Sequence, residues 1–270
     1  MPMIDLLSNQ VMCNIRSTSS SNDKNISKHI QLENWSVVKA ICRRSPKQTF
    51  RWSTRTGFFN GTRKSRVLPI HEAFANRAPP DVIEALLEAY PASIALKESC
   101  FGLTPLHIAC KFNAPVDSIR VAIKYNACAS TRDNHGRTPI HYVCSRNCKI
   151  DALRLLVKTY SKAVYYVDHR GWLPIHNACR YGADYKSIKL LVSIFPESVR
   201  ARTNMGFTPL KTILSVNCDE KEKTLQLLIN DGMLTKYCIN RDPEFALFMP
   251  NDKTASVYRE HNSVTHTSCC

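Results

Sequence analysis

Apolar residues recur at helical spacing in several short segments of the chain. In each segment they stand at positions i, i+3, i+4 and i+7, which places them on one face of a helix. The clearest examples are Ile83, Leu86, Leu87 and Tyr90, then Leu153, Leu156, Val157 and Tyr160, and then Ile188, Leu191, Val192 and Phe195. This pattern predicts a series of amphipathic helices, each with one buried stripe.

A second motif precedes these helices and repeats in step with them. It contains a proline, at positions 69, 105, 139, 174 and 209, so that the steps are 36, 34, 35 and 35 residues. Glycine stands three residues before four of these prolines, at Gly102, Gly136, Gly171 and Gly206. Proline is favoured at the first position of a helix, and threonine directly before it can cap the helix. Each unit therefore begins with a further short helix, which we expect to stop near Asn113, Asn147 and Gly182, since Asn and Gly tolerate the left-handed conformation at a helix end.

The sequence Thr104-Pro-Leu-His107, the period of about 35 residues and the turns Asp133–Gly136 and Asp168–Gly171 resemble the ankyrin repeat, from residue 68 to about residue 232. The resemblance implies an all-α, ankyrin-type α-solenoid of about five helix-turn-helix repeats with short linking hairpins. Some positions depart from the family pattern. Leucine replaces threonine at Leu68 and Leu173, the first unit lacks the phased glycine, and Pro91, Ser161 and Pro196 begin sequences that replace Gly-Ala after the second helix. These departures concern the geometry of the hairpins.

The domain boundaries follow from the repeat and from the composition of the ends. We expect a disordered tail over residues 1–30, a basic N-terminal capping helix and loop over 31–67, and a repeat domain over 68–240. Its units are expected near 68–103, 104–137, 138–172, 173–207 and 208–240. Residues 241–270 are expected to form a mostly disordered C-terminal tail.

The resemblance also implies where a partner would bind. In ankyrin-type repeats the variable contact positions lie beside the phased glycine and just before the end of the first helix. On the hairpins these are Phe101, Asn134, His135, Arg137, Arg170, Trp172, Asn204, Met205 and Phe207, and on the helices they are Lys111, Phe112, Ser145, Arg146, Arg180 and Tyr181. Arginine and aromatic residues are frequent among them, as in protein interfaces.

Histidine and cysteine also recur once per unit. His71, His107, His141 and His176 follow the phased prolines, and the resemblance implies that they form hydrogen bonds at the start of the helix. Cys110, Cys144 and Cys179 occupy a position between helices where a small apolar residue fits. An alternative is a zinc site formed by His141, Cys144 and Cys148. These side chains supply three ligands, whereas structural zinc takes four. We therefore expect no metal and no cofactor.

Positive charge is concentrated near the amino end. The chain has 37 Lys and Arg against 22 Asp and Glu, a net charge of +15. A basic segment without acidic residues contains Lys39, Arg43, Arg44, Lys47, Arg51, Arg55, Arg63, Lys64 and Arg66, interleaved with Phe50, Trp52, Phe58 and Phe59. Such a segment fits a nucleic acid or an anionic lipid, whereas the alternative is a solvated cap whose aromatic residues pack on the first repeat.

The sequence lacks the motifs that are typical of several classes of enzymes, nucleotide-binding proteins and membrane proteins. Neither G-x-G-x-x-G nor G-x-x-x-x-G-K-[ST] is present, nor H-E-x-x-H or G-x-S-x-G, and no apolar run approaches the length of about 18 residues that a membrane-spanning helix needs. We predict a non-enzymatic protein-protein interaction scaffold or adaptor that binds another protein through its concave surface, with an acidic protein as one candidate. The alternative is a binder of nucleic acid or anionic lipid through residues 39–66.

The expected location is the cytoplasm, with the nucleus as an alternative. No secretory signal is recognised at the start of the sequence, so we expect free thiols, although a disulfide framework remains the alternative for 12 cysteines. The terminal pair Cys269 and Cys270 leaves lipid anchoring open, but it does not fit the prenylation motif with cysteine fourth from the end. We expect a monomer.

Overall fold

The computed structural model describes residues 25–59, 61–145, 148–218 and 220–230. Helices dominate this part of the chain. The α-helices are α1 (Ile26–Gln31), α2 (Trp35–Arg44), α3 (Pro69–Ala75), α4 (Pro80–Ala89), α5 (Pro105–Lys111), α6 (Val116–Lys124), α7 (Pro139–Val143), α8 (Ile150–Thr159), α9 (Pro174–Arg180), α10 (Tyr185–Ile194), α11 (Pro209–Leu214) and α12 (Lys221–Asn230). Two short antiparallel strands, β1 (Ser53–Thr56) and β2 (Lys64–Val67), form a hairpin between α2 and α3.

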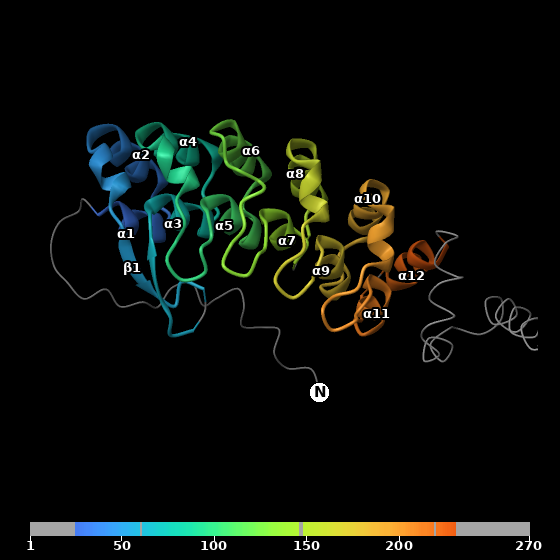
Figure 1. Cartoon of the computed structure of the whole chain (residues 1–270). Coiled ribbons are helices and arrows are strands. Elements are labelled where there is room, and N and C mark those ends of the chain that lie inside the picture. The colour runs from blue at the N-terminus through green and yellow to red at the C-terminus, as the bar shows by residue number, and fades with distance from the viewer. Residues whose placement is uncertain (1–24, 60, 146–147, 219, 231–270) are drawn as a thin grey trace, which may run out of the picture.

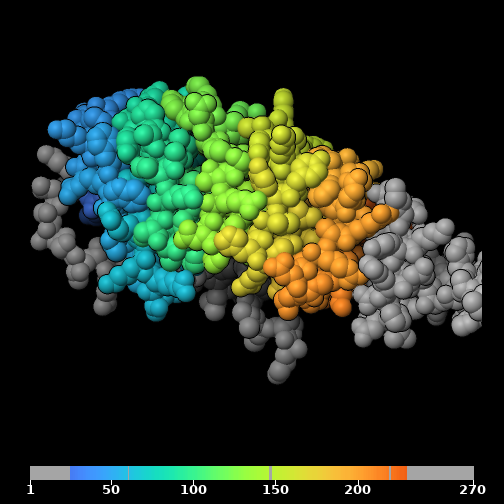
Figure 2. All heavy atoms as spheres, in the orientation of Figure 1, coloured from blue at the N-terminus to red at the C-terminus, as the bar shows by residue number. Residues whose placement is uncertain are grey.

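The helices form two layers (Figure 1). The inner helices α1, α3, α5, α7, α9 and α11 lie side by side, and the outer helices α2, α4, α6, α8, α10 and α12 pack on them and on one another in the same order. Helices α3 to α12 therefore make five helix pairs, which are numbered one to five here. Between successive pairs the chain forms linking turns at residues 97–103, 131–137, 166–172 and 201–207. In the space-filling view the pairs make one continuous body in chain order (Figure 2).

The inner helix of each of the five pairs begins at its phased proline, as the sequence predicts. The helix ends also follow the prediction where the structure describes them. Asn113 and Gly182 have positive φ values of 53° and 64° directly after their helices, and Arg77 takes the same conformation after α3. Asn147 lies outside the described residues.

A short 3-10 helix replaces the expected Gly-Ala turn after three outer helices. These segments are Pro91–Ala95, Ser161–Tyr165 and Pro196–Arg200, and each one directly follows an extended residue, Tyr90, Tyr160 or Phe195. The departures from the family pattern therefore change how the outer helix leads into the linking turn and leave the stacking of the pairs intact.

The amino end differs from the prediction in two ways. A single capping helix was expected after a disordered tail to residue 30, but α1 begins at Ile26 and pairs with α2. Its apolar residues Ile26 and Ile30 are 2% and 0% exposed because α1 packs on α3. A helix of six residues is too short to show a hydrophobic period. The hairpin β1–β2 is the second difference, in a segment predicted as a loop within an all-α fold.

The core runs through all pairs as one cluster. On the outer helices, the residues of the predicted apolar stripes belong to this core: Ile83, Leu86, Leu87, Leu153, Leu156, Ile188, Leu191 and Val192. The phased cysteines Cys110, Cys144 and Cys179 are 2% exposed or less, so they fill the predicted position between helices. Because a pair of short helices cannot bury its own apolar faces, each pair depends on its neighbours for stability.

Candidate protein-interaction surface

The recurring histidines hold the start of each inner helix to the chain that follows it. In the first four pairs the backbone N–H of the residue before the proline donates to the histidine Nδ1 at 3.0 to 3.2 Å. A nitrogen that accepts a hydrogen bond carries no proton, so the proton is on Nε2. That nitrogen donates to a backbone carbonyl of the following segment at 3.0 or 3.1 Å. Both ring nitrogens are used, which confirms the structural role that the sequence predicts.

Burial keeps these imidazoles neutral. It lowers the pKa of His71, His107 and His141 to about 4, and it also lowers the pKa of His176. A charged imidazole would lose its hydration inside the stack, and the carbonyl contacts offset only part of that loss.

A buried carboxylate near the start of each of the first three linking turns fixes the conformation of that turn. Asp133 Oδ1 accepts from the backbone N–H groups of His135 and Arg137, both at 2.8 Å. Asp168 makes the equivalent bonds to Arg170 and Trp172, both at 2.9 Å. In the first turn Glu98 takes this place. These side chains set the conformation that the sequence predicts for the D-x-x-G turns.

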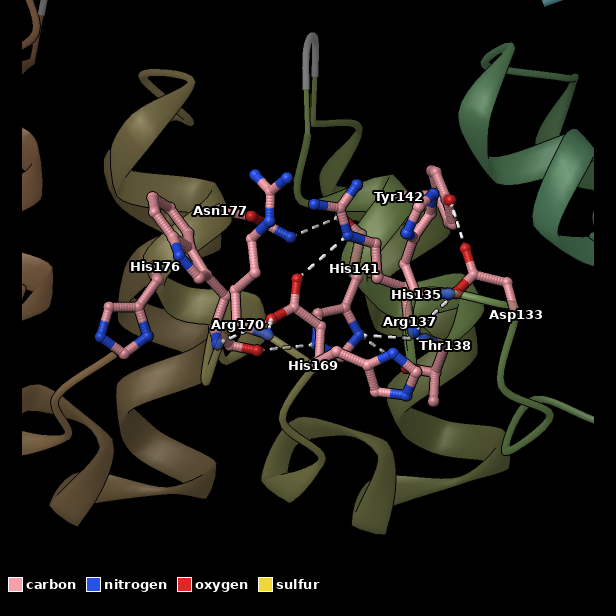
Figure 3. A network of polar contacts seen from close by, with 12 residues as sticks. Asp133, His135, Arg137, Thr138, His141, Tyr142, His169, Arg170, His176 and Asn177 are labelled. Atoms are coloured by element: carbon pink, nitrogen blue, oxygen red, sulfur yellow. Dashed lines mark hydrogen bonds and ion pairs between the residues drawn. The ribbon is translucent and has the colours of Figure 1, made fainter. Parts of the chain in front are cut away.

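Neighbouring turns are also joined to one another. Tyr142 donates its hydroxyl to Asp133 at 2.5 Å, and Arg137 Nε donates to Asp168 Oδ2 at 3.1 Å (Figure 3). The backbone N–H of His169 donates to the carbonyl of His135 at 2.9 Å. Gly136 is needed where it stands, because it has φ of +76° and a Cβ there would lie 2.6 Å from the His169 ring. The turns thus form a continuous ladder along one edge of the stack.

Residues 70–166 match the protein family described as Ankyrin repeats (3 copies). This part of the chain consists of ankyrin repeats. A search of curated proteins finds no match to the chain. In ankyrin repeats the linking turns and the ends of the inner helices form the surface on which sequence analysis placed the partner-binding residues. Fourteen of those fifteen residues are described here, and Arg146 lies outside the described residues.

The predicted binding residues divide into a covered part and an open part. Phe101, Lys111 and Phe112, in the second pair and its turn, are half-buried by the loop between β1 and β2. Phe59 lies 5.1 Å from the Phe101 ring centroid, and Phe58 lies 6.2 Å from that of Phe112. Sequence analysis assigned these loop aromatics to the first repeat, whereas Phe58 and Phe59 reach the second. Phe50 and Trp52 do pack on the first pair, against Tyr90 and His71.

The open part lies on the linking turns and inner helices of the third to fifth pairs. Tyr181 is 45% exposed and Met205 77% exposed. The Arg180 guanidinium lies 5.3 Å from the centroid of the Trp172 ring. The other predicted residues here are exposed at Asn134, His135, Arg170 and Asn204 and half-buried at Arg137, Ser145 and Phe207. Lys211, which sequence analysis noted only as a replacement for histidine, adds an ammonium group 5.5 Å from the Phe207 ring.

Charge is segregated between the two sides of the stack. On the inner helices of the five pairs and on the linking turns, the carboxylates are Glu72, Glu98, Asp133 and Asp168, and all four are buried. The exposed acidic residues of the described part lie elsewhere, for example at Asp81, Asp117 and Asp151 on outer helices. Exposed basic residues on the turns and inner helices include Arg132, Arg170, Arg180, Arg202 and Lys211. The open surface is therefore cationic.

The basic segment 39–66 is split between two structural elements. Arg43, Arg44 and Lys47 are exposed on α2 and the 3-10 helix Pro46–Phe50, and Arg51 directly follows it. Arg63, Lys64 and Arg66 belong to the hairpin, where Arg63 lies 5.7 Å from the Phe101 ring. Two members are neutralised, because Lys39 pairs with Asp81 and Arg55 with the buried Glu72, both at 2.5 Å.

Cys42, Cys110, Cys144 and Cys179 are buried thiols that form no disulfide. Burial raises the pKa of Cys110 and Cys179 well above the ordinary value and that of Cys42 to about 11. A hydrogen bond with Cys148 raises the pKa of Cys144 well above the ordinary value, and burial adds to this shift. His141 directs its ring nitrogens at Thr138 and at the Trp172 carbonyl. In the described ranges, no group of three or more His, Cys, Asp or Glu side chains is placed to hold a metal ion, and no helix is long and apolar enough to cross a membrane.

Proposed function

We propose that this ankyrin-repeat protein is a non-enzymatic scaffold or adaptor that binds a partner protein on the open surface of the third to fifth pairs. The observation that carries the proposal is the group of Arg and aromatic side chains around Arg180 on the fourth pair and its turn, where Arg170, Arg180 and Tyr181 are exposed and Trp172 is half-buried. Such residues supply most of the binding energy in protein interfaces. Ankyrin repeats in general mediate protein-protein interaction, which supports the same function.

The proposed interaction domain consists of residues 68–240, with all five helix pairs acting as ankyrin repeats and the pair α1–α2 as the amino-terminal cap. The α2 helix supports this role for the cap, because it packs on α4 as each outer helix packs on the next. The proposed location is the cytoplasm. The burial of Cys110, Cys144 and Cys179 as thiols supports a reducing compartment.

The covered part of the surface limits where the partner can bind. The loop between β1 and β2 already contacts Phe101 and Phe112, so a partner on those residues would have to displace Phe58 and Phe59. The open residues need no such displacement. We therefore place the main contacts on the third to fifth pairs.

A capture experiment with two matched triple variants tests the proposal. The first variant changes Arg170, Arg180 and Tyr181 to Ala, and the second changes Lys47, Arg51 and Lys64 to Ala. All six side chains are exposed, so both variants should keep the helical circular dichroism of the wild type. Arg55 is kept, since its removal would leave Glu72 buried without its cation.

Proteins captured at physiological salt by the wild type should be lost by the first variant and retained by the second. The second variant should only slow association, and only at low salt, because exposed charges on the cap mainly steer diffusion. Loss of capture by the second variant alone would show that the basic segment 39–66 is the functional site. In that case a nucleic acid or an anionic lipid becomes the better candidate for the ligand.

A further inference from the structure

An aromatic side chain of the protein itself, Phe59, contacts this surface as a bound ligand would. Phe59 sits on the second pair with its ring 4.7 Å from the ammonium group of Lys111, 5.1 Å from Phe101 and 6.4 Å from Phe112. The Lys111 ammonium also lies 5.5 Å from the Phe101 ring. One cation and two aromatic side chains of the surface thus hold one aromatic ring supplied from outside the repeats, an arrangement that cation–π and edge-to-face contacts favour.

A similar combination of a cation with two aromatic side chains occurs two units further along without a ring on it, although its first aromatic residue stands on the other side of the phased glycine. Lys111 and Phe112 stand six and seven residues after Pro105, and Arg180 and Tyr181 stand six and seven residues after Pro174. The Arg180 guanidinium lies 5.3 Å from the ring of Trp172, which directly follows Gly171, and the Lys111 ammonium lies 5.5 Å from the ring of Phe101, which directly precedes Gly102. The β1–β2 loop contacts the second pair, whereas Tyr181 is 45% exposed. The fourth pair therefore offers an open seat for an aromatic ring.

The surroundings of this open seat determine what else the ligand must carry. Arg170 and Arg202 are exposed on the neighbouring linking turns, and Lys211 is exposed on α11. Two carboxylates flank these residues in the chain: Asp168 is buried and accepts from Arg137, and the half-buried Asp184 accepts from the backbone N–H of Ser187 at the start of α10. Negative charge on the ligand is thus attracted on both sides of the seat and repelled by no exposed carboxylate of the turns or inner helices.

We propose that the surface of the fourth and fifth pairs binds an acidic segment of a partner protein, with an aromatic side chain of that segment seated between Trp172, Arg180 and Tyr181. This inference rests on the proposed function and specifies the chemistry of the partner. The Phe59 contact supplies the aromatic part, and the segregation of charge supplies the acidic part.

Binding of defined peptides to the full chain tests the inference. The probe is a fluorescein-labelled nine-residue peptide of aspartate and glutamate with one central phenylalanine. One comparison peptide has alanine in the centre, and another keeps the phenylalanine but replaces the acids by their amides. Fluorescence anisotropy should show that the first peptide binds at least tenfold more tightly than either comparison peptide.

Two variants with the same loss of charge separate the seat from general attraction to a basic protein. Arg170→Gln with Arg180→Gln should weaken binding of the acidic phenylalanine peptide at least tenfold. Arg120→Gln with Arg154→Gln removes two exposed arginines from the outer helices α6 and α8 and should change the affinity less than twofold. Tyr181→Ala should abolish the preference for phenylalanine over alanine.

Equal affinity for the phenylalanine and alanine peptides, or an equal effect of the two arginine pairs, would overturn the inference. Tighter binding of a single-stranded oligonucleotide than of the acidic peptide, with the same dependence on Arg170 and Arg180, would also overturn it. If the peptides fail while the captured protein still depends on Arg170, Arg180 and Tyr181, the inference is wrong and the proposed function stands. Loss of both dependences would reject the proposed function as well.

Discussion

The Oε2 atom of Glu98 lies 2.5 Å from the hydroxyl oxygen of Ser65, and both side chains are buried. The two residues are 33 positions apart, in the first linking turn and in strand β2. Glu98 also accepts from the backbone N–H groups of Cys100, Phe101 and Leu103 at 2.6, 2.7 and 3.1 Å. One carboxylate therefore fixes the first linking turn and joins it to the hairpin whose loop covers Phe101 and Phe112.

Replacing Glu98 by Ala should destabilise this end of the repeat stack. The change leaves backbone N–H groups of the turn without their acceptor, and each unmatched buried donor costs about 1–3 kcal/mol. We expect the free energy of unfolding in urea to fall by about 3 kcal/mol or more. Ser65→Ala removes only one neutral donor and should cost about 1 kcal/mol. A loss for Glu98→Ala no greater than that for Ser65→Ala would show that the backbone contacts do not matter.

Removal of the Phe59 ring should expose the seat on the second pair. Phe59→Ala should lower the free energy of unfolding by about 1–2 kcal/mol, because a half-buried ring loses its aromatic contacts and part of its apolar burial. The control is Phe50→Ala, whose ring packs on Tyr90 of the first pair. The Phe59 variant alone should bind a second equivalent of the acidic phenylalanine peptide. Unchanged stoichiometry in a calorimetric titration would contradict the equivalence of the two seats.

Stability should fall as the pH is lowered through the range of the buried histidines. The pKa of His141 is about 4 in the folded chain and about 6.5 in the unfolded chain. Between these values the unfolded chain binds a proton that the folded chain does not, so lower pH favours unfolding. Stability is fully present above pH 6.5 and is lost toward pH 4, with a slope of up to about 1.4 kcal/mol per pH unit for each such histidine.

Urea unfolding at several pH values checks the histidine prediction. His141→Gln should lower stability at neutral pH and also reduce the slope between pH 4 and 6.5. His135→Gln, at an exposed position in the second linking turn, should leave both nearly unchanged. An undiminished slope for the His141 variant would mean that other groups cause the acid sensitivity.

The cysteines should differ in reactivity according to burial. Cys128 is exposed, and hydrogen bonds with Ser130 and Thr131 lower its pKa, which raises the fraction of reactive thiolate. It should react with a thiol reagent well before Cys110, Cys144 and Cys179, as mass spectrometry of the labelled native protein would show. Rapid labelling of the three phased cysteines would contradict the packing between helices.

The effect of a substitution at Cys144 on folding stability should depend on the size and charge of the new side chain. Cys144→Ala keeps a small apolar side chain and should cost about 1 kcal/mol, whereas Cys144→Arg buries a charge and should prevent folding. Circular dichroism and thermal unfolding distinguish the two results. Neither a chelator nor a reductant should change the melting temperature of the wild type, because stacking and not a metal or a disulfide stabilises the fold.

The repeated units could be predicted from the sequence because each of their contacts is made by a residue at a fixed place in the period. The prolines of all five units, the histidines of the first four and the cysteines of the second to fourth each have the same local environment from unit to unit, so a pattern in the sequence reports a pattern in space. The two helices of the cap carry no such period. Helix α1 is defined by the burial of Ile26 and Ile30 against α3, which is a tertiary contact and leaves no local signal.

The candidate surface was predictable only in part. The positions beside Gly171 and at the end of α9 follow from the register of the repeat, so Trp172, Arg180 and Tyr181 could be named in advance. The cover over Phe101, Lys111 and Phe112 could not, because Phe59 lies in a segment outside the period. The sequence also treated residues 39–66 as one basic group, whereas partners distant in the chain, Asp81 and Glu72, neutralise two of its members.

The ladder of linking turns also bears on how such a chain can change its length. Asn134, His169 and Asn204 each donate a backbone hydrogen bond to the carbonyl of the preceding turn, at Phe101, His135 and Arg170. Duplication or deletion of one whole unit, such as residues 138–172, would bring equivalent donors and acceptors together again. Insertion of a few residues within a turn would break the ladder on both sides. Evolution of this protein can therefore add or remove binding surface in whole units, and each added unit would bring new side chains at the positions that Arg180 and Tyr181 occupy in the fourth.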